Sequence, residues 1–165
     1  MIKIAKILFA SLLFVLSTKV YAHCQVPCGI YGDAVRIVQI EEDITTVRKA
    51  MNMINDLAGQ SDAQSLNQLS RWVRTKEDHA QKVQETVLNY FLAQRVKAKE
   101  KGSKERQQYV DQTLTLHQLI VSMMKCKQTV EQRNCSNAFE LLDKFTNLYF
   151  DQHGIDHLKK LKKEK

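Results

Sequence analysis

Residues 33–57 read DAVRIVQIEEDITTVRKAMNMINDL. Apolar side chains recur along this stretch in steps of three and four residues, which is the spacing of one face of an α-helix. They are Ile37, Ile40, Ile44, Val47, Met51, Ile54 and Leu57. Asp33 is a suitable N-cap, and we expect Gly59 to end the helix. The stretch predicts a long amphipathic helix that buries one seam.

Three further segments show the same periodicity. The second follows Asp62 and extends to about Ala98, the third opens after Gly102, and the fourth runs from near Asn134 to near Gly154. The seam of the second segment is Leu66, Leu69, Val73, Ala80, Val83, Val87 and Tyr90, with Lys76 as its one polar interruption. No alternating strand pattern competes with these helices. The sequence predicts an all-α, antiparallel up-and-down four-helix bundle with an N-terminal hook.

The first 22 residues have the layout of a secretory signal peptide. Two lysines precede the apolar run ILFASLLFVL, and Val20 and Ala22 occupy the small-residue positions of a cleavage site. The run is too short to cross a bilayer, and no later segment is apolar enough to do so, so we expect no stable membrane span after cleavage. We therefore expect cleavage after Ala22 by a processing peptidase and export to the periplasm or the outside.

Charge divides the chain in the same way. The 25 basic residues fall to 22, against 18 acidic ones, once residues 1–22 are removed, and five lysines lie in residues 159–165. The remaining body is close to neutral, which argues against a nucleic-acid-binding face. The expected organisation is a signal peptide at 1–22, a hook at 23–33, a bundle at 34–158 and a basic tail at 159–165.

The expected new terminus reads His23-Cys24-Gln25-Val26-Pro27-Cys28-Gly29-Ile30-Tyr31. The free α-amine, the amide nitrogen of Cys24 and the thiolates of Cys24 and Cys28 form an N₂S₂ donor set, if the chain turns sharply at Pro27 and Gly29. A planar site of this kind favours Ni(II) or Cu(II) over tetrahedral zinc. The imidazole of His23 remains as an axial donor.

The pattern H-C-x-x-P-C-G-x-Y at a processed terminus resembles the nickel hook of nickel-dependent superoxide dismutases. The resemblance implies a helical bundle, one nickel ion per subunit, superoxide as substrate and a homohexamer. It implies that His23, Cys24 and Cys28 bind the metal and that Tyr31 guards the approach to it. Pro27 shapes the hook, and Asn89-Tyr90-Phe91 resembles a family stretch whose tyrosine also lines the approach.

Two departures from the family accompany this resemblance. The glutamate that holds the axial imidazole in the family has no secure counterpart, with Gln39, Glu41 and Glu42 nearby. His79 stands where some members have an arginine, and a surface role for it is the simpler interpretation. Outer-sphere groups of this kind tune a metal site.

Other interpretations of the cysteines remain open. Cys24 and Cys28 are close enough in sequence for a disulfide, which would leave a structural bundle without metal. An exported bundle that binds nickel or copper without turnover is the second alternative. Cys126 and Cys135 flank the turn between the last two helices, where a stapling disulfide is plausible in an exported protein, against two free thiols.

Overall fold

The computed structural model describes residues 31–163, and all regular structure within them is helical. The elements are α2 (Asp33–Asp56), α3 (Ala63–Glu85), the π-helical η1 (Thr86–Arg95), α4 (Arg106–Gln128), α5 (Gln132–Tyr149) and α6 (Gln152–Lys163). The predicted helical bundle is confirmed.

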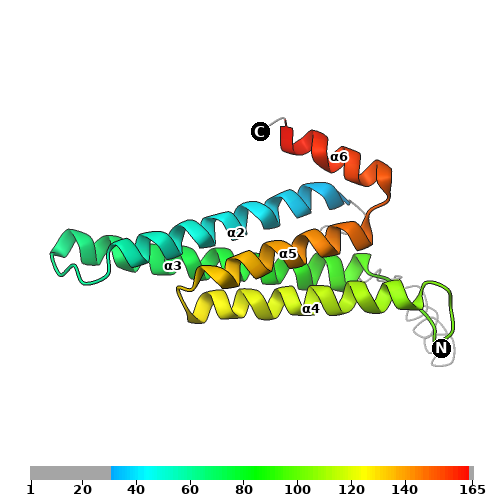
Figure 1. Cartoon of the computed structure of the whole chain (residues 1–165), viewed down its shortest axis with the longest axis horizontal. Helices are drawn as coiled ribbons and strands as arrows, with labels where there is room; N and C mark the ends of the chain where they lie inside the picture. Colours follow the sequence, from blue (N-terminus) through cyan, green and yellow to red (C-terminus); the bar gives the residue numbers. More distant parts are fainter. Residues whose placement is uncertain (1–30, 164–165) are drawn as a thin grey trace, which may run out of the picture.

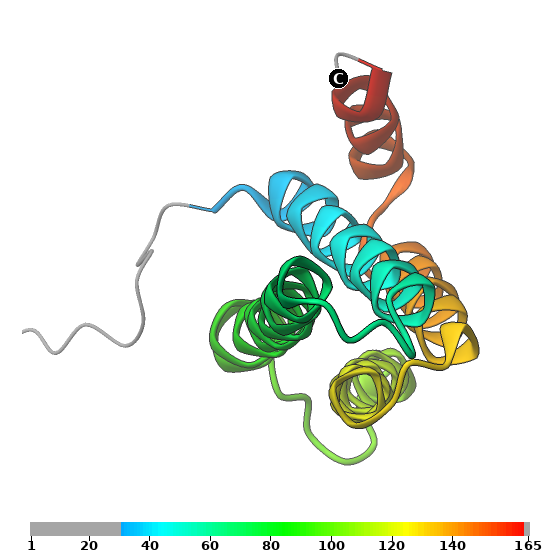
Figure 2. The same ribbon diagram turned by 90° about the vertical axis from the view of Figure 1, so that its left-hand side faces the viewer.

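Four long helices lie side by side, and consecutive ones run in opposite directions (Figures 1 and 2). α2 packs on α3 and α5, and α4 packs on the same two helices, so the four close into a ring around one core. The short α6 lies outside this ring against α2. The first ordered turn of α2 therefore sits at the end of the bundle where η1 and α5 finish (Figure 1).

The predicted seam of α2 is confirmed. Ile37, Ile40, Ile44, Val47 and Met51 are essentially inaccessible to solvent. They meet Val83 and Val87 of the second segment, Leu116 and Met123 of α4, and Ala138, Leu142 and Phe145 of α5. Burial on this scale, at roughly 25 cal/mol per Å² of apolar surface, holds α2 in place without help from its polar termini.

Asp33 is not the N-cap of α2, contrary to expectation. Gly32 occupies that position and makes no capping bond through a side chain, while Asp33 is the first helical residue. The Asp33 carboxylate is instead bound by side chains from η1 and α5. At the other end α2 stops at Asp56, and Gly59 lies beyond it in a turn with φ of 84°, a conformation that favours glycine.

The predicted seam of the second segment is wrong in its first half. Leu66 and Val73 are 50% and 41% exposed, because the α2–α3 hairpin extends past the ends of α4 and α5 (Figure 1). Lys76, which interrupts the pattern, is only 4% exposed. The segment begins after Asp62 as predicted, and the carboxylate of this N-cap residue accepts from the amides of Gln64 and Ser65.

The second segment also ends differently from expectation. After Glu85 the helix widens into η1, and it stops at Arg95 rather than near Ala98. The amide of Val96 donates to the carbonyl of Phe91, five residues earlier, at 2.8 Å. Short π-helical stretches of this kind are frequent at functional sites.

The last predicted helix is two helices. α5 ends at Tyr149, and Gly154 lies inside α6 instead of ending the fourth segment. A Cβ at Gly154 would lie 2.4 Å from the Phe150 ring, so glycine here allows a close approach. Residues 159–163 of the expected tail belong to α6, which buries Leu158. No helix among residues 31–163 is long and apolar enough to cross a membrane.

Candidate functional site

A cluster of four polar side chains lies where the chain enters α2. Asp33, Tyr90, Arg95 and Tyr149, here called the Asp33 cluster, come from the start of α2, from η1 and from the end of α5. Arg95 Nε lies 2.9 and 3.1 Å from the two carboxylate oxygens of Asp33, and its Nη2 lies 2.6 Å from Oδ2. The hydroxyl of Tyr90 donates to Oδ1 at 2.6 Å, and that of Tyr149 donates to Oδ2 at 2.8 Å.

The cluster has a settled protonation state. Burial raises the pKa of the Asp33 carboxyl, but the hydrogen bonds from Arg95, Tyr90 and Tyr149 outweigh burial and lower that pKa below its usual value. Burial and the bond to Asp33 raise the pKa of Tyr90 to about 12, and the same causes raise that of Tyr149. At neutral pH the carboxylate and guanidinium are therefore charged and the two phenols are neutral.

Tyr31 lies at the edge of this cluster. Its ring packs edge-on against the Tyr90 ring, with centroids 6.1 Å apart, and the guanidinium carbon of Arg95 lies 4.1 Å from its centroid. The residue is nevertheless 42% exposed. The amide of Gly32 donates to the Tyr90 hydroxyl at 2.9 Å. Both the side chain before α2 and the backbone at its N-cap are thus attached to η1.

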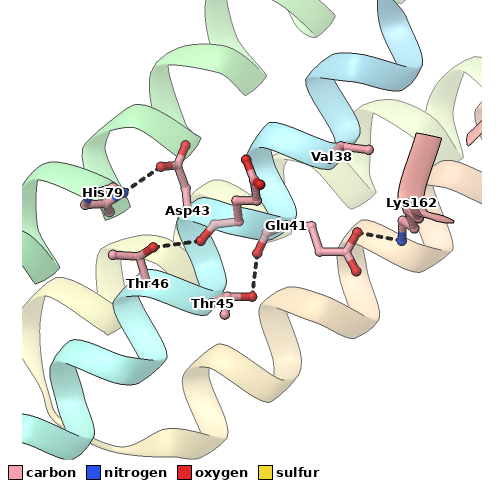
Figure 3. Close-up of a pocket in the computed structure, with 8 residues that line it drawn as sticks. Val38, Glu41, Asp43, Thr45, Thr46, His79 and Lys162 are labelled. Atoms are coloured by element: carbon pink, nitrogen blue, oxygen red, sulfur yellow. Dashed lines mark hydrogen bonds and ion pairs between the residues drawn. The ribbon is translucent and has the colours of Figure 1, made fainter. Parts of the chain in front are cut away.

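A second polar site lies farther along α2. A pocket of about 630 Å³ is lined by Val38, Glu41, Glu42, Asp43, Thr45, Thr46, His79 and Lys162 (Figure 3). His79 Nδ1 of α3 lies 2.6 Å from Asp43 Oδ1, and Lys162 Nζ of α6 lies 2.5 Å from Glu41 Oε2. His79 is half-buried and paired with Asp43, and the surface role expected for it stays a prediction.

The pocket distinguishes the three residues that lie near the position of the family's imidazole-binding glutamate. Glu41 and Glu42 line it, whereas the exposed Gln39 accepts from Arg36 Nη1 at 2.8 Å on the side chain's own helix. Only the two glutamates therefore face a space that another group can enter.

The thiols of Cys126 and Cys135 are free, fully buried and 3.7 Å apart. Cys126 lies in the last turn of α4 and Cys135 in the first turn of α5, at the end of these helices away from Asp33. The predicted disulfide between them stays a prediction.

The signal peptide and the proposed ligands His23, Cys24 and Cys28, with Pro27, lie outside the described residues. Within residues 31–163, no group of three or more His, Cys, Asp or Glu side chains is arranged to hold a metal ion. Tyr31 and Tyr90 are the two residues of the predicted site that the structure describes, and it brings them into contact.

The family of the chain follows from its sequence as a whole. A family-wide sequence profile described as nickel-containing superoxide dismutase matches residues 18–153. The chain belongs to the nickel-containing superoxide dismutase family. Neither the comparison with curated proteins nor that with solved structures yields a match.

Membership of the nickel-containing superoxide dismutase family has direct consequences. The protein is an oxidoreductase that acts on superoxide, and its cofactor is nickel. The matched range includes the whole stretch from His23 to Tyr31 as well as the Asp33 cluster. The hook and the cluster are thus adjoining parts of one nickel superoxide dismutase chain.

Sequence reasoning missed three members of the cluster in this nickel superoxide dismutase. Asp33 was expected as a cap, and Arg95 and Tyr149 were given no role. Periodicity assigns helices and faces, but it does not say which helix ends meet. The one available signal is that Asp33 and Arg95 carry opposite charges at the ends of two predicted helices.

Proposed function

We propose that the mature chain begins at His23 and converts two superoxide anions and two protons into O₂ and H₂O₂ at a nickel ion held by the hook. The single observation that carries this proposal is the order His23, Cys24, Pro27, Cys28 inside the range matched by the nickel superoxide dismutase family. The Asp33 cluster, which fixes Tyr31, Gly32 and Asp33 to the bundle, supports it.

The donor set suits nickel. The α-amine of His23, the amide nitrogen of Cys24 and the thiolates of Cys24 and Cys28 are the strong-field nitrogen and soft sulfur ligands that stabilise square-planar Ni(II). The imidazole of His23 would be a further nitrogen donor, which would favour the higher oxidation state of the metal. A nickel ion held by these residues would supply a Ni(III)/Ni(II) couple for the one-electron oxidation and reduction of superoxide.

The two tyrosines have different parts in this proposal. The Tyr90 hydroxyl already accepts from Gly32 and donates to Asp33, so it orders the base of the hook. Tyr31 is exposed and lies beside it, and its hydroxyl is the better candidate to bind superoxide or an ordered water by hydrogen bonding. Tyr31→Phe should therefore raise KM or lower turnover, while nickel content stays at the wild-type level.

We also propose export, processing by a peptidase and assembly into a homohexamer. The predicted signal peptide supports export. The exposed apolar side chains of Leu66 and Val73, on the protruding end of the α2–α3 hairpin, support self-association. Light scattering on the mature protein measures the assembly state. A monomer would contradict the proposed hexamer but not the proposed export or processing.

One native sample tests the central proposal. Amino-terminal sequencing should give His23 first, metal analysis should give one nickel per chain, and a superoxide assay should show turnover. Cys24→Ser or Cys28→Ser should abolish nickel binding and turnover, with the helical content unchanged by circular dichroism. His23→Ala should retain Ni(II) but lose most of its activity.

Other results would contradict the proposal. A different first residue removes the amine ligand, and a Cys24–Cys28 disulfide in fresh protein removes both thiolates. Nickel or copper bound without superoxide turnover would identify a metal-binding bundle instead.

A further inference from the structure

We propose that Arg95 and Asp33 are positioning residues of the nickel site, which hold Tyr31 and Gly32 and through them the base of the hook. The inference rests on the proposed function in one respect, namely that the residues before Tyr31 bind the metal. The contacts that carry it all lie within the described residues.

Arg95 binds two groups at once. The edge of its guanidinium forms a fork on Asp33, and the side chains of this pair are 26% and 16% exposed. Its face lies over the Tyr31 ring, at 4.1 Å from the guanidinium carbon to the centroid. A planar guanidinium is suited to both contacts, and a lysine ammonium reproduces neither the fork nor the stack. Arg95 therefore fixes the ring of Tyr31 relative to the start of α2.

Asp33 anchors the arginine to the bundle. Besides Arg95, its carboxylate accepts from Tyr90 and Tyr149, so its orientation is set from η1 and from α5. Tyr90 in turn accepts the amide proton of Gly32. One carboxylate thus links α2, η1 and α5 to Tyr31 and Gly32, near the end of the predicted hook.

The bundle does not need this cluster to hold α2. The helix is already fixed by its buried seam from Ile37 to Met51. Asp33 lies before that seam, and Arg95 is the last residue of the π-helical segment. What the cluster adds is a fixed position for Tyr31 and Gly32, from which the eight residues 23–30 extend. Metal sites need such support, because a loosely held ligand loop loses its geometry.

Arg95→Lys tests the inference, with Lys76→Met as the matched control. The first variant keeps the charge but loses the fork and the stack. The control removes a buried cation from the middle of α3, where it binds the end of α4. Hydrogen exchange of the Gly32 amide and the ring NMR signals of Tyr31, both read on nickel-free protein, report on the cluster directly.

We expect Arg95→Lys to speed Gly32 exchange and to shift the Tyr31 ring signals. In loaded protein it should broaden the electron paramagnetic resonance spectrum of the nickel and lower turnover about tenfold, the effect typical of groups behind metal ligands. Lys76→Met should leave the Gly32 amide, the Tyr31 ring and the nickel spectrum as in the wild type, although it destabilises the fold.

The outcomes separate the two proposals. Wild-type exchange and ring signals in Arg95→Lys would overturn the positioning role, even if nickel turnover is established. Failure of the wild type to bind nickel would overturn the proposed function, while Gly32 and Tyr31 still report on the cluster. If Arg95→Lys does not fold, Tyr149→Phe removes one bond to Asp33 and should speed Gly32 exchange about threefold. No change there would also overturn the inference.

Discussion

The two ends of the bundle each bury a charged side chain, but they satisfy it in different ways. At one end Asp33 is bound by a guanidinium and two phenols that lie 57 to 116 residues away in sequence. At the other end Lys76 donates to backbone carbonyls of Cys126 at 2.9 Å and of Thr129 at 3.4 Å, and to that of Lys127. It also pairs with Glu77 at 3.0 Å.

The difference separates stabilisation from positioning. The last carbonyls of a helix have no partner within the helix, and they carry its negative dipole end, so a buried ammonium satisfies them where α4 stops. Among the described residues, Lys76 contacts the end of α4 and Glu77 and does not contact Tyr31 or Gly32. The Asp33 end lies next to Tyr31 and Gly32. The buried Lys76 therefore serves the fold, whereas the partly buried Asp33 serves both the fold and the position of Tyr31 and Gly32.

The largest effect on stability should come from Lys76→Met. The variant keeps most of the apolar stem but leaves the carbonyls of Cys126, Lys127 and Thr129 without their shared donor. We expect a loss of about 3 kcal/mol in the free energy of unfolding, measured by urea denaturation. Lys82→Met, an exposed lysine of the same helix, should change it by less than about 0.5 kcal/mol. Equal midpoints for the two variants would contradict the role assigned to Lys76.

The same lysine shows where sequence reasoning stops. In the sequence, Lys76 is a polar interruption of the second seam. The pattern does not reveal that its long side chain reaches the end of α4. Leu66 and Val73 fit the seam but are exposed, because the hairpin outruns its neighbours. The α2 seam was predictable from Ile37 to Met51, where helix period and burial coincide, whereas Ile54 and Leu57 at its end are only half-buried.

The site divides in the same manner. The ligand pattern from His23 to Cys28 is local, and its chemistry can be read from residue types and spacing. Tyr90 was found only through the resemblance of Asn89-Tyr90-Phe91 to the family. Arg95 contacts Tyr31 because the folded chain brings the end of η1 next to the start of α2. The spacing of residues along the sequence does not predict this contact.

The second largest effect concerns Cys126 and Cys135 beside Lys76. We expect an exported sample to contain the disulfide, and closing so short a loop should stabilise the fold by about 2.5 kcal/mol. The hydrogen bond from Cys126 lowers the pKa of the Cys135 thiol. Alkylation in denaturant followed by intact mass analysis measures the bridge. Two alkylated thiols in freshly isolated native protein would show that the pair stays reduced.

The third effect distinguishes the Asp33 end by its pH dependence. The folded pKa of Asp33 is lowered, so its stabilising contribution is complete above the unfolded value of about 3.9 and is lost as the pH falls through the folded value. Asp33→Asn should therefore destabilise the protein at pH 6, and the difference from the wild type should shrink below about pH 4. Urea unfolding at several pH values measures this. A difference that stays constant into acid would mean that the Asp33 charge contributes nothing.

The smallest effect should come from the pocket between the two ends. His79 of α3 and Asp43 of α2 form a half-buried pair at this pocket. We expect His79→Gln to cost about 1 kcal/mol of stability, with His117→Gln, an exposed histidine of α4, as the control. The nickel spectrum should stay unchanged, because Asp43 already accounts for the imidazole in the described structure. A changed spectrum would instead show that this pocket influences the nickel site, as Asp33 is proposed to do. Glu41, Glu42 and His79 would then face the hook.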